Sequence, residues 1–397
     1  MNILVLTDIL PAPVLLQKVR ENDVLITTAE LHERMHPDVH YTFVFLLYTS
    51  FLTSFHPKRK EQKEFLKLQS YMLNGRKIEI LAVPTFVKNE IFWPLYMYLA
   101  FLRNRSKLKR IIRDNKIDIV HAHYVLTNLG MAYQINKFLK IPFIVTCRHL
   151  ARAEYVRPHI NKFMKKAKGL INLGAFEEKL SAGMNPNAYR ISHGIDDRFL
   201  KQNKVFNSGK ILKIVTVSRL LYWKNIDKIL LALEEIQTGF TWDIFGDGPH
   251  FDTLKELVDH SSIKDKVVFH GHVAYDEVPQ VLVNYDLFVL PSFRELFGRV
   301  YIEAMACGIP VIGARNTGMD GYITEGEQGF LVSHEEHSEL KTAIQRFIDD
   351  PELKITMGKK AKLFSQDFSW TNIINKLDTV YRKSLNGTGS VPDSSAS

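Results

Sequence analysis

The chain has 397 residues, too many for one ordinary hydrophobic core, and its 46% hydrophobic and 24% charged residues are typical of a globular protein with two domains. Two cysteines, Cys147 and Cys307, are too few for a disulfide framework or a cysteine-rich zinc site and indicate a reducing cytoplasm. The net charge of +9 is concentrated in residues 1–200, which hold 30 Lys and Arg against 17 Asp and Glu, whereas residues 201–397 hold 22 against 26. The basic half indicates either an anionic partner or a solvated basic surface.

The first residues, MNILVLTDIL, lack a basic n-region and enter a strand pattern at once, so we expect no signal peptide. The longest apolar-looking stretch, residues 41–55, is too short for a comfortable membrane span. The sequence therefore predicts a soluble, cytoplasmic protein that does not cross a membrane.

In the first half, short apolar runs alternate with longer segments of helical periodicity. The runs predict strands at 3–6, 41–47, 78–83, 117–120, 142–146 and 169–173. Their continuous apolarity is typical of parallel strands that are covered on both faces.

The second half repeats this pattern. Its runs predict strands at 211–217, 242–245, 267–270, 287–290 and 310–312, with helices at 225–236 and 339–349. The predicted fold class is α/β, with two doubly wound Rossmann-like domains facing a cleft and ligands at the carboxyl ends of the strands. The predicted limits are 1–197 for the N-terminal domain, 198–210 for a polar linker, 211–367 for the C-terminal domain and 386–397 for a disordered tail.

The segment 287–308, LFVLPSFRELFGRVYIEAMACG, carries the strongest chemical signal. It predicts a strand, a loop with Glu295 and Gly298, and a helix that begins near Arg299 and ends at Gly308. Glu295 and Glu303 could then face one pocket, where carboxylates accept hydrogen bonds from sugar hydroxyls. A glycine and a helix N-terminus beside them suit a phosphate-bearing ligand. The alternative is that Glu303 is an ordinary, partly exposed helix residue.

These residues resemble the GT-B "glycosyl transferases group 1" family, which is also described as glycosyltransferase family 4-like and includes bacterial surface-polysaccharide and lipopolysaccharide enzymes. The family pattern is Pro-Ser, an E-x7-E pair with Phe-Gly after the first Glu, and E-A-M-A-x-G-x-P-V. It stands here as Pro291-Ser292, Glu295, Phe297-Gly298 and residues 303–311. Further similar segments are Gly318, GFLV (329–332), VSRLLYWKNID (217–227), FGDGP (245–249), the strand run 267–271 and SHGID (192–196). The resemblance also implies that 368–385 form a helix that crosses back to the N-terminal domain.

The resemblance implies a role for each matched residue. Glu303 would hold the ribose of a nucleotide-sugar, Glu295 the donor sugar, and Arg219 and Lys224 the diphosphate. It places further donor-binding residues at Gly246, His272, Leu296, Phe297 and Gly298. The E-x7-E branch also implies retention of the anomeric configuration.

The proposed roles of Arg219 and Lys224 have an independent physical basis. Cleavage of a nucleotide-sugar leaves a diphosphate that gains negative charge in the transition state, and fixed cations stabilise that charge. Arg fits phosphate with two parallel donors, and Lys acts as a point charge. Without the matched motif, both would more readily be surface charges. The chain has no Asp-x-Asp pair to hold a divalent ion on the diphosphate, so we expect no metal and no cofactor besides the donor itself.

Three histidines in the first half are further candidates. His149 follows a predicted strand and resembles a family position that faces the reacting sugar; the alternative is a satisfied surface histidine. His121 and His123 would share one face if their strand continued, and the resemblance implies an acceptor-side or structural role. A metal on this pair would need a third ligand, and none is evident in the sequence.

The chain departs from the family pattern at several positions. Residues 10–13, Leu-Pro-Ala-Pro, replace a glycine-rich first loop, Leu296 stands where glycine is usual, and His193 where Asn is common. Arg299 replaces an aliphatic residue, which suggests an acidic donor such as a uronic acid.

Basic segments with apolar neighbours punctuate the first half, at 56–69, 101–113 and 163–169, with an aromatic cluster in 91–102. Such surfaces bind anionic bilayers peripherally, which would give access to a lipid-linked acceptor. The alternative is a solvated face over a core helix.

Taken together, the sequence predicts a metal-independent, retaining glycosyltransferase of the hexosyltransferase type. It would move a sugar from a nucleotide-diphosphate sugar to a lipid-linked glycan in bacterial surface-polysaccharide synthesis, such as cell wall, capsule, exopolysaccharide or teichuronic acid. The alternative is a sugar-nucleotide epimerase on the same fold. A nucleic-acid-binding protein is disfavoured because no reading module is recognisable, and an NAD enzyme because residues 7–13 lack G-x-G-x-x-G.

Overall fold

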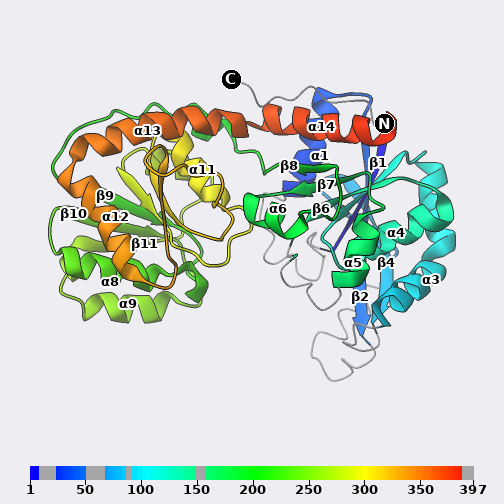
Figure 1. Ribbon diagram of the computed structural model, residues 1–397, viewed down its shortest axis with the longest axis horizontal. Helices are drawn as coiled ribbons and strands as arrows, with labels where there is room; N and C mark the ends of the chain where they lie inside the picture. The colour runs from blue at the N-terminus through cyan, green and yellow to red at the C-terminus, as the bar shows by residue number, and fades with distance from the viewer. Residues whose placement is uncertain (9–23, 51–67, 86–91, 149, 151–156, 387–397) are drawn as a thin grey trace. The chain divides into compact units, whose positions relative to one another are not determined.

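The computed structural model describes residues 1–8, 24–50, 68–85, 92–148, 150 and 157–386 (Figure 1). The chain divides into two compact units. Unit 1 comprises Met1–Leu173, Glu177–Ile191 and Ile374–Ser397, and unit 2 comprises Gly174–Phe176 and Ser192–Ile373. In the described part of the chain, no helix is both long enough and apolar enough to cross a bilayer.

Unit 1 is built on an eight-stranded sheet with the order β3-β4-β2-β1-β5-β6-β7-β8. The strands are β1 (Asn2–Thr7), β2 (His40–Ser50), β3 (Ser70–Leu73), β4 (Arg76–Thr85), β5 (Ile119–His123), β6 (Phe143–Cys147), β7 (Gly169–Asn172) and β8 (Ala188–Arg190). All neighbouring pairs are parallel except β3 and β4. The helices of this region are α1 (Val24–Met35), α3 (Trp93–Asp114), α4 (Thr127–Leu139), α5 (Arg157–Met164) and α6 (Ala175–Ser181).

Strand β3 is the antiparallel exception because a tight turn reverses the chain. Asn74 and Gly75, between β3 and β4, both have positive φ, at 47° and 74°. An Asn-Gly pair with two positive φ angles is the preferred two-residue hairpin connection, since its twist matches that of the strands. Strands β3, β8 and β14 were not predicted from the sequence.

Unit 2 is a six-stranded, wholly parallel sheet with the order β11-β10-β9-β12-β13-β14. Its strands are β9 (Leu212–Val217), β10 (Phe240–Phe245), β11 (Val267–Gly271), β12 (Leu287–Val289), β13 (Val311–Ala314) and β14 (Gly329–Val332). Its helices are α7 (Asp197–Leu200), η4 (Tyr222–Lys224), α8 (Ile226–Ile236), α9 (Phe251–Asp259), η5 (Lys264–Lys266), α10 (Val278–Leu282), α11 (Arg299–Ala306), α12 (His337–Asp349), α13 (Pro351–Ser365) and η6 (Gln366–Phe368). The doubly wound α/β class predicted from sequence is confirmed.

The strand order of unit 2 reverses between β9 and β12. From β9 the chain proceeds outward through β10 and β11, then returns to β12 on the other side of β9 and proceeds to β14. Loops that leave two such strands at their carboxyl ends diverge and form the ligand crevice of open α/β sheets. The β9–α8 and β12–α11 loops are therefore where a ligand is expected.

Residues 198–210, predicted as a linker, group with unit 2. Phe199 is fully buried, and Lys204 Nζ donates to the carbonyl oxygen of Val283 at 3.0 Å, so this polar stretch is anchored against the second unit. The predicted crossing helix corresponds to η6 and α14 (Trp370–Asn386), whose residues from Ile374 onward group with unit 1. Residues 387–397 of the predicted tail lie outside the described residues.

Candidate functional site

The loop after β9 carries both predicted cations. Arg219 lies two residues after the end of β9, and its side chain is exposed, with no hydrogen-bond or ion-pair partner among the residues the structure describes. Lys224 ends the η4 turn, and Asn225 then adopts a left-handed conformation (φ 54°) before α8 begins. The sharp turn brings Lys224 back toward the sheet, and its side chain is only 14% exposed.

Lys224 and Glu295 join the two loops of the crevice. Lys224 Nζ donates a hydrogen bond to Glu295 Oε1, and the Glu295 side chain is also 14% exposed. The loop backbones are tied as well, because Phe293 N and Ser292 Oγ both donate to the carbonyl oxygen of Trp223, each at 3.1 Å. The predicted cation and the predicted sugar-binding carboxylate therefore lie together at the strand-order reversal.

Gly298 is the N-cap residue directly before α11 and is required there for two reasons. Its φ is +78°, and a Cβ atom would lie 2.6 Å from the ring of Tyr301. Tyr301 is buried, and its hydroxyl donates to the carbonyl oxygen of Leu290. The helix itself runs from Arg299 to Ala306, with Gly308 at φ +77° after it, as the sequence predicted.

Phe297 is a buried residue of this loop, only 3% exposed. Its ring packs against three others, those of Tyr322 at 5.5 Å, His193 at 6.0 Å and Phe368 at 6.1 Å between centroids. The side chain of Phe297 therefore packs inside unit 2 and stabilises the loop. Its neighbour Leu296 is half-buried.

Glu303 lies one turn into α11 and is buried, 4% exposed, so it is not an ordinary, partly exposed helix residue. Its Oε1 accepts a hydrogen bond from the Tyr275 hydroxyl at 2.8 Å and lies 3.0 Å from Arg299 Nε. Burial raises the pKa of Glu303, while the charge of Arg299 and the two hydrogen bonds act in the opposite direction. The contacts fix one carboxylate oxygen and leave the other without a described hydrogen bond.

Gly246 and His272 follow the neighbouring strands β10 and β11. Gly246 has φ +130°, its N–H donates to the carbonyl oxygen of Gly271 at 2.6 Å, and a Cβ atom would lie 1.8 Å from the Ser218 carbonyl oxygen. Only glycine permits this close approach of the loops after β9 and β10. His272 is exposed at the carboxyl end of β11.

Tyr275 and Arg198 belong to the same region and were not predicted from sequence. The guanidinium of Arg299 lies 5.1 Å from the Tyr275 ring centre and that of Arg198 lies 5.8 Å from it. Arg198 Nε and Nη2 in turn donate to the two oxygens of Asp196 at 2.9 and 3.0 Å. No motif marks Tyr275, because its role depends on the fold bringing the loop after β11 to the start of α11.

The predicted acceptor residues His121 and His123 lie in β5, in unit 1, with ring centres 3.9 Å apart on one face of the strand. His121 Nδ1 lies 2.6 Å from the Tyr381 hydroxyl and Nε2 lies 2.7 Å from Thr146 Oγ1. Burial lowers the pKa of His121 to about 3, so its ring is neutral. Because both ring nitrogens of His121 are hydrogen-bonded within unit 1, its contacts are those of a structural residue. His149 and residues 10–13 lie outside the described residues.

The comparisons with known proteins agree with this fold. Residues 31–198 match the family model "Glycosyltransferase Family 4", and residues 197–364 match "Glycosyl transferases group 1". An uncharacterized glycosyltransferase of Methanocaldococcus jannaschii is 27% identical over 72% of this chain and 81% of its own length. N-acetyl-alpha-D-glucosaminyl L-malate synthase of Bacillus anthracis is 27% identical over 70% of this chain and 77% of its own.

Three solved structures share the architecture. Sucrose-phosphate synthase of Thermosynechococcus elongatus has a TM-score of 0.69 at 18% identity, covering 96% of this chain and 98% of its own. Anabaena HepE in complex with UDP and glucose has 0.65 at 19%, covering 96% and 100%. The lipopolysaccharide outer core galactosyltransferase WaaB has 0.70 at 15%, covering 96% and 99%. These matches do not favour the epimerase alternative. The family models and the two parallel-sheet units together identify the chain as a glycosyltransferase of GT-B fold.

Proposed function

We propose that this enzyme transfers a hexosyl group, with retention and without a divalent metal, from a nucleotide-diphosphate sugar to a lipid-linked glycan in bacterial surface-polysaccharide synthesis. The observation that carries the proposal is the Lys224–Glu295 hydrogen bond, which joins the loops after β9 and β12 at the strand-order reversal. A cation for the diphosphate and an acceptor for sugar hydroxyls are thereby held next to each other.

The two cations of the β9–α8 loop supply the charge that a metal ion would otherwise provide. Arg219 is exposed and has no partner in the described chain, so its two-pronged guanidinium is available to phosphate oxygens. Lys224 is half-buried, where its charge is screened less than in bulk water. Both would stabilise the departing diphosphate more strongly than the bound donor.

The buried carboxylate of Glu303 suits a ribose. Tyr275 and Arg299 hold Oε1, which leaves Oε2 to accept a hydroxyl hydrogen bond. Since Arg299 already contacts Glu303 and lies over the Tyr275 ring, it is better explained as a support for this carboxylate than as a ligand for an acidic donor sugar. The uronic-acid hypothesis for Arg299 therefore gains no support here.

For the donor and the acceptor, support comes from similarity to proteins of known ligand or substrate. HepE is described with UDP and glucose, which supports a uridine diphosphate donor. WaaB acts on the lipopolysaccharide outer core, which supports a surface-glycan acceptor such as a capsule, exopolysaccharide or teichuronic acid precursor. Retention rests on the E-x7-E spacing of Glu295 and Glu303.

Peripheral contact with an anionic membrane is supported by one face of α3. Side chains at spacings of three or four residues share this face and are exposed. Its first half is apolar, with the N-cap residue Phe92 and with Leu95, Leu99 and Leu102 each 40–48% exposed. Its second half is basic, with Arg103, Lys109, Arg110 and Arg113 exposed. A stripe that runs from apolar to basic matches the acyl boundary and the phosphates of an anionic bilayer.

Flotation with vesicles tests the membrane contact. The wild-type protein should float with vesicles containing anionic lipid and not with neutral ones, and salt should release it. The double variant Leu95→Glu/Leu99→Glu should lose binding, whereas Leu363→Glu, on an exposed position of α13 in unit 2, should not. Binding that ignores lipid charge and salt would end this part of the proposal.

A panel of nucleotide-sugars tests the activity itself. We expect one donor class to raise the melting temperature and to be consumed only when a glycan acceptor is present. NMR of the product should show the anomeric configuration of the donor, and an α-donor that gives a β-product would contradict retention. Turnover should not require added Mg²⁺ or Mn²⁺. Isomerisation of a donor sugar in the absence of acceptor would instead support the alternative function, a sugar-nucleotide epimerase.

A further inference from the structure

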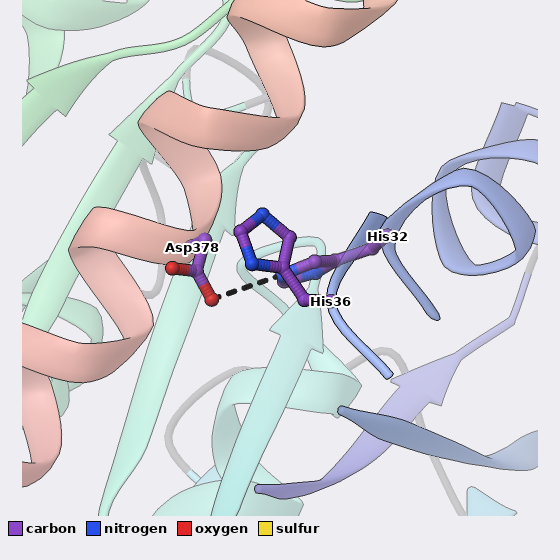
Figure 2. Close-up of side chains that lie close together, drawn as sticks. All are labelled: His32, His36 and Asp378. Atoms are coloured by element: carbon purple, nitrogen blue, oxygen red, sulfur yellow. Dashed lines mark hydrogen bonds and ion pairs between the residues drawn. The ribbon is translucent and has the colours of Figure 1, made fainter. Parts of the chain in front are cut away.

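We propose that unit 1 contains a structural zinc site formed by His32 of α1, His36 directly after the C-terminal end of α1, and Asp378 of α14. One ligand atom from each of these residues lies within 4.8 Å of the others. Figure 2 shows the two imidazoles and the carboxylate facing one another, with the contact between His32 and Asp378 drawn as a dashed line. The inference does not depend on the proposed function, because all three residues belong to unit 1 and the donor-site candidates belong to unit 2.

His36 follows the last residue of α1, and its N–H donates to the His32 carbonyl oxygen at 2.8 Å, so the helical turn continues and places the two histidines on the same side. The intervening Glu33 is engaged elsewhere: its Oε1 accepts from Tyr41 N at 2.7 Å, and its Oε2 from Arg76 Nη2 at 2.6 Å. In the helical zinc sites of hydrolases, the intervening Glu acts as a general base beside the histidines. Glu33 is not available for that role here. The geometry points to a structural site.

The distance between His32 and Asp378 already suits a tetrahedral zinc ion. His32 Nε2 lies 3.1 Å from Asp378 Oδ1. Around a zinc ion with ligands at about 2.0–2.2 Å, neighbouring ligand atoms are about 3.3–3.5 Å apart. The ligand atom of His36 lies within 4.8 Å of both, so its side chain would have to move closer for zinc to bind, and a water would complete four ligands.

The hydrogen bonds that His32 and Asp378 make to other residues are compatible with the site both without zinc and with zinc bound. His32 Nδ1 lies 2.7 Å from the Tyr41 hydroxyl, which can donate to it or accept from it. When His32 Nε2 binds the metal, Nδ1 carries the proton and donates it to Tyr41, the arrangement that fixes histidine ligands in zinc proteins. Arg382 Nε donates to Asp378 Oδ2 at 2.7 Å and so directs Oδ1 toward the histidines.

His36 provides the observation that points to a ligand. Its Nε2 atom is shielded from solvent and has no hydrogen-bond partner among the residues that the structure describes. A buried polar nitrogen without a partner costs free energy, and metal coordination would remove that cost. The His36 ring stands at 90° to that of His32, with centres 5.1 Å apart.

The surrounding charge and the ligand set favour zinc. Arg382 also donates to Asp38, at 3.0 and 3.2 Å, so its positive charge is divided between the carboxylates of Asp38 and Asp378. Two imidazoles with one carboxylate suit Zn²⁺, whereas Mg²⁺ and Ca²⁺ prefer oxygen ligands. A zinc ion here would bind the C-terminal helix to α1.

Zinc binding to the full-length protein tests the inference, with His36→Gln as the variant and His40→Gln, an exposed histidine of β2, as its matched control. After removal of metals with a chelator, equilibrium dialysis against zinc chloride is followed by metal analysis. We expect one zinc per chain for wild type and His40→Gln, and at least about tenfold weaker binding for His36→Gln. Equal affinity of the two variants would overturn the proposal.

Two further measurements keep the test independent of how well the variant folds. Zinc, but not magnesium, should raise the melting temperature of the wild-type protein, because a ligand that binds the native state in preference to the unfolded state stabilises it. Cobalt(II) bound to the wild-type protein should show the strong visible absorption of a tetrahedral site and lose it when zinc is added. A stabilisation that zinc and magnesium share, or the weak absorption of octahedral cobalt, would overturn the site.

Discussion

Lys224 Nζ donates a hydrogen bond to Glu295 Oε1, across two loops that leave adjacent parallel strands in opposite directions. The pair is half-buried, so removing one partner leaves the other with an uncompensated charge. Each residue thus holds the other in place before any ligand binds, which is the preorganisation that stabilises a charged transition state without further rearrangement.

Replacing Lys224 by Met should lower kcat by about 10²–10³-fold, because a cation aimed at the developing diphosphate charge is lost. Glu295→Gln should also lower activity, and the double variant should lose less than the product of the two separate losses, since both changes break one contact. The control Lys213→Met, at an exposed position of β9, should retain wild-type kinetics. Independent, multiplicative losses in steady-state assays would argue against a shared site.

Replacing Arg299 by Leu should change the pH dependence of the enzyme. Glu303 must be ionised for both of its carboxylate oxygens to act as acceptors, and burial raises its pKa while Arg299 lowers it. The acid limb of kcat/KM should therefore move to higher pH in Arg299→Leu. Arg294→Leu, at an exposed position in the same loop, should leave the limb in place. An unmoved limb in both variants would show that the ionisation of Glu303 does not control donor binding.

Gly246→Ala should destabilise the protein by about 3 kcal/mol or more, because the new Cβ atom would lie 1.8 Å from the Ser218 carbonyl oxygen at a φ of +130°. Gly326→Ala is the matched control. It has φ +79° but no atom within 4 Å of the added Cβ, so only the left-handed conformation is penalised, by about 1–2 kcal/mol. Equal losses in urea denaturation would mean that the loops after β9 and β10 are not in close contact.

Unit 1 should lose stability in mild acid through His121. Its pKa is lowered to about 3 in the folded state, from 6.5, so between these values the unfolded chain binds a proton that the folded chain does not. Stability from this group therefore falls as pH decreases through that window, by up to about 1.4 kcal/mol per pH unit. His121→Asn should show a shallower decrease in denaturation between pH 6.5 and 5. An unchanged slope would indicate that His121 is protonated in the folded protein.

Local sequence patterns predicted many of the strands and helices of the fold. Continuous apolar runs predicted the long parallel strands, and Gly308 predicted the end of α11, because glycine readily adopts the positive φ that it has at this position. The short strand β8 has no apolar run to mark it, and all three of its residues are at least partly exposed. The Asn74-Gly75 pair between β3 and β4 is typical of a two-residue hairpin turn and could have predicted β3.

The parts of the site that the sequence did not reveal depend on long-range contacts. Tyr275 reaches Glu303 across 28 residues, and His32 meets Asp378 across 346. Neither separation has a periodicity that a single sequence can show. The motif placed Phe297 among the ligand contacts, yet its ring is buried among Tyr322, His193 and Phe368. A motif thus identifies the loop, and the packing decides which of its side chains face outward.

Binding of a nucleoside diphosphate to Arg219→Ala tests the central claim most directly. Calorimetric titration of the wild-type protein with the diphosphate of its preferred donor should give one site per chain. Arg219→Ala should weaken that binding by about 10–100-fold, since a charge-assisted pair is lost, while its melting temperature stays unchanged because Arg219 has no partner among the described residues. Undiminished binding by Arg219→Ala would contradict a diphosphate site at the carboxyl end of β9.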